Sequence, residues 1–309
     1  MRHLRVAVCL AVTALCLGFA TIGQSAVITV SSYGAVGDHL TIQAAYNASS
    51  AGDTIVVGPG DYDASISIHR RLTILGAGYD LTTNRSFTFE SGSTGSVLEG
   101  FWCVNGGNAI HLHEAADSIY IRRCRLASNY AAWDVFGRDG GGNGMHLWLE
   151  DCEIINMTSD GDGLTCYYDT VIVRNCVFAH VNGGYSSGHA IVGYPNYLDV
   201  INCTFLGYYD LLGLSGNAPF LFMNNIVYDW SSNGDWGDYP VGSVFAYNAS
   251  SDRLPPGTDA ILLEENPFVD YDESGIYLPG VSDLHLNDTT LCIDAGNPAI
   301  LDKASGTVI

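Results

Sequence analysis

The sequence predicts an all-β chain folded as a right-handed parallel β-helix, a solenoid with an N-terminal capping helix. Two observations predict this fold. Strand-like segments of one pattern recur about every two dozen residues between Leu72 and Asn225, and a short helix-forming segment precedes them. That period is too short for a propeller blade and fits one turn of a solenoid. Each strand should pair with its equivalent one coil away.

The repeated segment alternates apolar and polar residues and ends in a polar residue followed by cysteine, which is the pattern of a strand entering a turn. The copies are Ile119–Cys124, Leu147–Cys152, Val171–Cys176 and Leu198–Cys203, and a fifth, Phe220–Asn225, ends in asparagine. Gly76 and Gly100 hold the same phase upstream. Stacking of coils places the four cysteines in one column, which we expect to be a ladder of buried free thiols. Asp151, Asn175, Asn202 and Asn224 should form a ladder of turn residues beside it.

The capping helix is expected at Thr41–Ser49, where Thr41 is a candidate N-cap and Ile42, Ala45 and Ala48 share one helical face. The whole stretch resembles the N-terminal cap of the pectate lyase-like superfamily in four short motifs. They are Gly34–Asp38, Gln43–Ala45, Gly52–Ile55 and Pro59–Tyr62, in that order. With the coils, the resemblance covers about residues 27 to 230. It implies the fold but not the function, because one fold hosts many activities.

The chain begins with a basic start, Arg2 and Arg5, and an apolar run, Val6–Ala20, which predict a signal peptide over residues 1–26. A β-helix with its cap is expected over 27–254. Pro255 and Pro256 break the repeat, so 255–309 is expected to be a C-terminal cap segment, consistent with a truncated end. These features predict a secreted or cell-surface monomer with no membrane span in the mature chain.

The chain carries 12 Lys and Arg against 33 Asp and Glu, a net charge of −21. That balance argues against nucleic acid or an anionic membrane as a partner. An acidic polysaccharide would need a bridging cation, and Ca²⁺ is the cofactor that carboxylates favour. Asp160 and Asp162 are the candidate ligands.

In the superfamily that the cap resembles, the strand before the anchor strand usually carries the binding face, so the resemblance implies a binding face on the strand before each cysteine-ended strand. On three successive coils it carries Asp134, then Ser159–Asp162, then Gly188–Ile191. This order resembles the polygalacturonase family, which has an Asp, an Asp-Asp pair and Gly-His-Gly. The resemblance implies glycoside hydrolysis, with Asp162 and Asp160 as acid and base, Asp134 assisting and His189 orienting or sharing a proton. This sequence departs from the family: Gly161 splits the Asp pair, Ala190 replaces a glycine, and the later Arg-x-Lys motif is absent.

Aromatic and polar residues on the same expected face suit sugar rings, because a tyrosine offers both a flat apolar face and a hydroxyl. The predicted substrate-binding residues are Tyr167, Tyr194, His111, His113 and Asp210. The chain is therefore expected to act on or bind an extracellular polysaccharide.

Two other function classes stay open at this point. A Ca²⁺-dependent polysaccharide lyase would need a base to remove the proton α to a carboxylate, for which the candidates are Arg122, Arg123, Arg125, Arg138 and Arg174. A surface or adhesin module would bind glycan along a rigid face without cleaving it.

Overall fold

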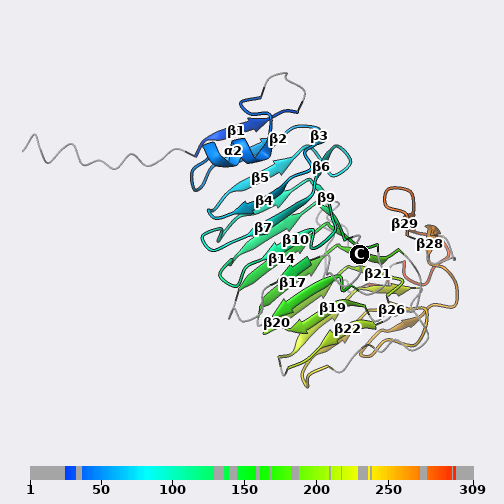
Figure 1. Ribbon diagram of the computed structural model, residues 1–309. Helices are drawn as coiled ribbons and strands as arrows, with labels where there is room; N and C mark the ends of the chain where they lie inside the picture. The colour runs from blue at the N-terminus through cyan, green and yellow to red at the C-terminus, as the bar shows by residue number, and fades with distance from the viewer. Residues whose placement is uncertain are drawn as a thin grey trace, which may run out of the picture.

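The computed structural model shows an elongated stack of parallel coils with the N-terminal end of the coils at the top of Figure 1. It describes residues 25–32, 37–128, 145–157, 161–167, 169–181, 188–208, 210–216, 218–228, 236, 239–271, 277–293 and 295–296, with the backbone of 136–138. The predicted right-handed parallel β-helix is confirmed. Within the described residues, no helix is both long and apolar enough to cross a membrane.

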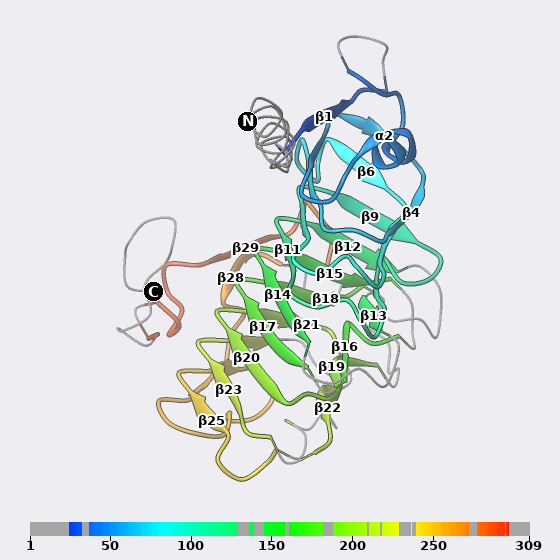
Figure 2. The ribbon, with the colours of Figure 1, turned by 90° about the vertical axis from the view of Figure 1, so that its left-hand side faces the viewer.

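Three parallel sheets form the walls of the coil. The first sheet faces the viewer in Figure 2. It contains β1 (Val27–Val30), β2 (Thr54–Val57), β5 (Thr73–Gly76), β8 (Val97–Glu99), β11 (Ile119–Arg122), β14 (His146–Glu150), β17 (Thr170–Arg174), β20 (Tyr197–Ile201), β23 (Phe220–Met223) and β25 (Val244–Ala246).

The second sheet follows the turn after each first-sheet strand. It contains β3 (Gly60–Asp61), β6 (Thr82–Asn84), β9 (Trp102–Asn105), β12 (Arg125–Ser128), β15 (Glu153–Asn156), β18 (Val177–His180), β21 (Thr204–Leu206), β24 (Ile226–Tyr228), β26 (Ala249–Ser250) and β27 (Ile261–Leu262).

The third sheet closes each coil and leads back to the first. It contains β4 (Ser65–Ile68), β7 (Ser86–Phe89), β10 (Ile110–Leu112), β13 (Phe136–Arg138), β16 (Leu164–Tyr167), β19 (His189–Tyr194) and β22 (Asp210–Leu214). This is the expected binding-face sheet. Its fourth strand is described over Phe136–Arg138, and Asp134, which the sequence places on this coil, lies outside the described part.

The repeated segments pair in register, as predicted. Leu147 and Leu149 of β14 lie between the equivalent residues of β11 and β17, and both are buried in the core. Their neighbours Trp148 and Glu150 face outward. Because side chains alternate between the two faces of each strand, the inward residues of successive coils stack in apolar columns, and these columns form a single continuous core.

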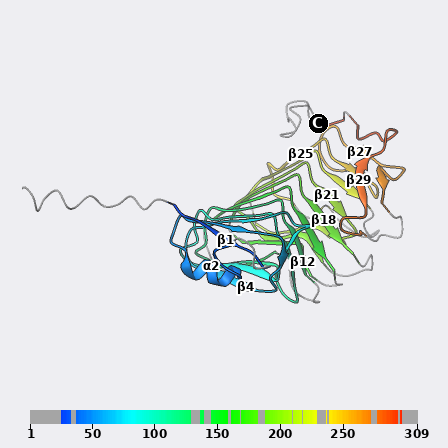
Figure 3. The ribbon, with the colours of Figure 1, turned by 90° about the horizontal axis from the view of Figure 1, so that it is seen from above.

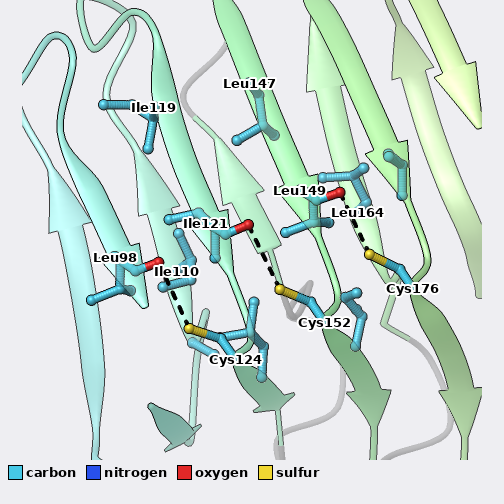
Figure 4. Close-up of a cluster of buried hydrophobic side chains, with 14 of the residues drawn as sticks. Leu98, Ile110, Ile119, Ile121, Cys124, Leu147, Leu149, Cys152, Leu164 and Cys176 are labelled. Atoms are coloured by element: carbon cyan, nitrogen blue, oxygen red, sulfur yellow. Dashed lines mark hydrogen bonds between the residues drawn. The ribbon is translucent and has the colours of Figure 1, made fainter. Parts of the chain in front are cut away.

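The cysteine column is confirmed: Cys124, Cys152, Cys176 and Cys203 are buried and free. Figure 4 shows three of these thiols directed at carbonyl oxygens of the preceding coil, those of Leu98, Ile121 and Leu149. Burial raises the pKa of the Cys124, Cys152 and Cys176 thiols well above the ordinary value. The column continues as Asn225 and Asn248, whose side chains bond each other and the backbone.

The turn ladder beside it is confirmed as well. Asn175 donates to Asp151, Asn202 to Asn175 and Asn224 to Asn202, at 3.1, 3.3 and 3.1 Å. All four residues have φ between 52° and 57°. Asn and Asp tolerate this left-handed region better than other residues with a side chain, which explains their recurrence before the anchor.

The predicted capping helix is α2 (Ile42–Ala48), and the Thr41 side chain accepts from the Ala44 N–H as its N-cap. It lies at the N-terminal end of the stack and packs on β1 and β2. Ile42 and Ala45 are buried as expected, but Tyr46 takes the third buried position and Ala48 is exposed.

The C-terminal segment packs against the outside of the second sheet, where Figure 3 shows β29 beside β18 and β21. Its antiparallel pair is β28 (Phe268–Asp270) and β29 (Asp283–Leu286). Phe268, Tyr271 and Tyr277 cover an outer apolar column, which is Ala127, Ile155, Ala179 and Leu206. The boundaries of the signal peptide and of the cap segment stay predictions.

Candidate active site

Three polar residues stand at the start of successive third-sheet strands. Asp162 lies two residues before β16, His189 begins β19, and Asp210 begins β22. His189 pairs directly with Asp210, and Leu164 with Ile191, so the three follow one line across the coils. Their side chains are 24%, 27% and 27% exposed, so solvent reaches each of them.

His189 lies between the two carboxylates. Its ring nitrogen Nδ1 is 3.0 Å from Oδ1 of Asp162, and the same oxygen accepts the His189 backbone N–H at 2.6 Å. The other ring nitrogen, Nε2, is 3.6 Å from Oδ2 of Asp210. That separation is longer than a hydrogen bond, so an oxygen of water or substrate can interact with both atoms.

The surroundings favour the protonated imidazole. The hydrogen bond that the His189 ring donates to Asp162 raises the pKa of His189 above its ordinary 6.5, burial opposes the rise, and the charges of Asp162 and Asp210 add to it. A raised pKa increases the protonated fraction of His189 at a given pH, and a protonated imidazole is a proton donor that water can recharge. The site is therefore equipped for general acid–base chemistry.

The core side of this line is tightly packed. Gly163 follows Asp162, and a Cβ there would lie 2.6 Å from the Ala190 carbonyl oxygen and 2.8 Å from the Tyr208 hydroxyl. Tyr208 is buried, and its ring contacts His180 edge-on. Because the core side is filled, a ligand can reach Asp162 and His189 only from the outer face of the sheet.

Tyr167 is the last residue of β16 and Tyr194 is the last residue of β19, and both side chains lie on the same side of the sheet. Their rings stack at 5.9 Å between centroids, and Tyr194 is 46% exposed. Five residues separate Tyr194 from His189, or about 16 Å along a strand. The tyrosine pair thus lies at the opposite end of the strands from the carboxylates. Because the two rings stack on each other, each has one side covered by the other.

Of the remaining predicted site residues, His111 and His113 are not brought to this line. His111 pairs with Thr88 and Gly137 on coils nearer the N-terminus, about 14 Å from β19 at the usual strand spacing. His113 lies in a local turn, where its Nδ1 accepts from the Ala115 N–H. Asp134 and Asp160 lie outside the described residues, so their predicted roles stay predictions.

The predicted Ca²⁺ site also stays a prediction. In the described part of the chain, no group of three potential metal-ligating side chains lies close enough to hold an ion. Asp162 Oδ1 already accepts two hydrogen bonds from His189. We therefore assign Asp162 to His189.

Asp210 was predicted to bind substrate, and that role stays a prediction. The structure adds that its carboxylate lies 3.6 Å from Nε2 of His189. The one available signal was its position just before an apolar strand, matching those of Asp162 and His189.

The fold that carries this outer-face site is a right-handed parallel β-helix. No protein-family model matches the chain, and no curated protein sequence does. Among solved structures, the chain is similar to a mutant pectin methylesterase bound to a hexasaccharide, with TM-score 0.57 and 14% identity over 84% of this chain and 98% of the other. A second pectin methylesterase–hexasaccharide complex gives 0.54 and 15% over 84% and 98%. The pectin methylesterase PemA from Erwinia chrysanthemi gives 0.50 and 14% over 87% and 100%. These similarities establish the fold.

Proposed function

We propose that this protein is an exported polysaccharide hydrolase whose proton donor is His189, held by Asp162 and faced by Asp210. The observation that supports it most directly is the line of Asp162, His189 and Asp210 on the solvent side of the third sheet. An exposed aromatic residue, Tyr194, shares that face and gives sugar rings a surface to contact. The similar solved structures, two of them carrying hexasaccharides, support a glycan as the ligand class.

The distance between His189 and Asp210 favours one hydrolytic route. Glycosidases that use two carboxyl groups keep them roughly 6.5–9.5 Å apart in inverting enzymes, to admit a water, and about 5–5.5 Å apart in retaining enzymes. Nε2 of His189 and Oδ2 of Asp210 are 3.6 Å apart, which is shorter than either separation and nearer the retaining one. We therefore favour double displacement with retention at the anomeric carbon.

In the first step, Asp210 attacks the anomeric carbon and the glycosidic bond breaks. The leaving oxygen takes the Nε2 proton of His189. In the second step, neutral His189 takes a proton from water, whose oxygen bonds the anomeric carbon as the bond to Asp210 breaks. Asp162 stays ionised beside Nδ1 of His189 and stabilises the imidazolium, as the buried aspartate does in the Asp–His pair of a serine hydrolase.

The lyase route has less support from the structure. Arg122 and Arg123 pair with Glu99 on the first sheet, and Arg125 pairs with Glu153 on the second. Arg174 belongs to the first-sheet strand β17, and the Arg138 side chain lies outside the described part. No arginine with a described side chain faces the Asp162–His189–Asp210 line as a base.

A panel of neutral and acidic glycans tests the proposal. Hydrolysis releases reducing ends without ultraviolet absorbance. By NMR, the product first formed should have the same anomeric configuration as the glycosidic bond that was cleaved. Absorbance from an unsaturated uronate would replace the proposal with elimination, and retention on a glycan without cleavage would replace it with a binding module.

A further inference from the structure

Gly213 lies directly against the imidazole of His189. It belongs to β22, on the coil that follows β19 along the chain, and it pairs in register with Val192. A Cβ built on Gly213 would lie 2.5 Å from Cδ2, 2.7 Å from Nε2 and 2.8 Å from Cγ of His189. All three nearest atoms belong to that one ring, so the absence of a side chain at Gly213 makes room for the ring.

The backbone does not require glycine at this position. Gly213 is not among the residues with positive φ, whereas Gly193 has φ 129°. A Cβ on Gly193 would collide with the backbone of Cys166, so that glycine serves the coil itself. Gly213 differs, because the three atoms nearest to its Cβ all belong to one side chain of the candidate site, that of His189.

We propose that Gly213 is a positioning residue that sets the orientation of the His189 ring. With no side chain at 213, the ring lies flat over β22, with Nδ1 on Asp162 and Nε2 toward Asp210. Any larger residue pushes the ring off this line and breaks one or both contacts. The catalytic consequence rests on the function proposed above, but the positioning does not.

Gly213→Ala is the variant that tests it. The ring is 27% exposed and can rotate toward solvent, so the coil should fold with an unchanged circular dichroism spectrum. Val192→Ala is the matched control, because it changes the paired position on the neighbouring strand without adding atoms beside His189.

The first readout is the NMR titration of the His189 ring, which a purely structural glycine would not change. In Gly213→Ala, loss of the Asp162 contact should bring the His189 pKa down toward 6.5, while Val192→Ala leaves it at the wild-type value. A wild-type titration in Gly213→Ala would overturn the proposal.

The second readout is a double-mutant cycle, which remains decisive if Gly213→Ala alone folds poorly. When His189→Ala removes the ring, the added methyl has nothing to displace. Gly213→Ala should therefore leave the melting temperature of the His189→Ala variant unchanged. An equal loss in both backgrounds would make Gly213 a structural residue.

Activity separates the two claims. On a glycan that the wild type cleaves, Gly213→Ala should lower kcat by at least about tenfold with KM little changed, because the proton donor moves while the binding face does not. If no glycan is cleaved, the proposed hydrolysis fails, and the titration and the cycle still decide whether Gly213 positions His189.

Discussion

One oxygen of Asp162 accepts both the backbone N–H and the ring Nδ1 of His189, at 2.6 and 3.0 Å. The same arrangement occurs between Asp117 and His146 at the first sheet, at 2.7 and 3.1 Å. An aspartate on one coil can thus hold a histidine on the next wherever the parallel register brings them together. What distinguishes the candidate site is a second carboxylate, Asp210, on the following coil.

Stability should depend on pH through His189. Its folded-state pKa is raised, so the stabilisation is fully present below the unfolded value of 6.5 and is lost as pH rises through the folded pKa. We expect the urea midpoint of the wild type to fall over that interval and that of Asp162→Asn to fall less. Parallel pH dependences of the two proteins would contradict the assignment.

The turn ladder predicts an order of stability at Asn202. Asn202→Gly keeps the φ of 57° without strain but loses the side-chain bonds to Asn175 and Asn224. Asn202→Ala loses the bonds and places a Cβ in the left-handed region, which costs about 1–2 kcal/mol more. Urea denaturation should rank wild type, glycine and alanine in that order, and alanine above glycine would be the contrary result.

The cysteine column should be invisible to alkylating reagents in the folded protein. Cys124, Cys152 and Cys176 are buried and their pKa values are raised, so almost no thiolate is present to react. Mass spectrometry after iodoacetamide should find these peptides unmodified in buffer and fully modified in urea. Disulfide-linked peptides joining any two of them would disprove the free-thiol ladder.

The C-terminal segment should depend on Arg125. Its guanidinium is 5% exposed, pairs with Glu153 and Asp80, and lies over the rings of Tyr79 and Trp102. Tyr277 donates to the same Glu153 from the C-terminal segment. Arg125→Met leaves Glu153 without its ion-pair partner and should cost about 3–5 kcal/mol in urea denaturation. Tyr277→Phe should cost only about 1 kcal/mol, as one neutral donor is lost; equal costs would show that Arg125 is not the anchor.

The sequence predicted the coils because their signal repeats. The anchors Cys152, Cys176 and Cys203 each follow an Asp or Asn in the left-handed region and are buried, and Cys124 follows Arg123 in the same conformation. The outer packing of the second sheet had a weaker signal, the consecutive apolar pairs such as Ile154 with Ile155 and Phe205 with Leu206. Such pairs are typical of strands buried on both faces.

The site was harder to predict, because its members come from coils of unequal length. Only the register shows that Asp210 faces His189. Gly213 gave no signal, since a glycine in a strand suggests a bulge or a close approach without naming the neighbour. The polygalacturonase-like order pointed to Asp162 and His189, which are in contact, and to Asp160 and Asp134, whose roles stay predictions.

The central claim is that Asp162 and His189 act together on a glycan, and the rate of Asp162→Asn on the cleaved glycan tests it most directly. The amide cannot stabilise the imidazolium, so kcat should fall by about 10²-fold or more, since general acid–base catalysis contributes at least that much. Val192→Ala, on the same strand as His189, should keep the wild-type rate. A near-normal rate for Asp162→Asn would contradict the account and leave Asp162 as a residue that only supports the turn before β16.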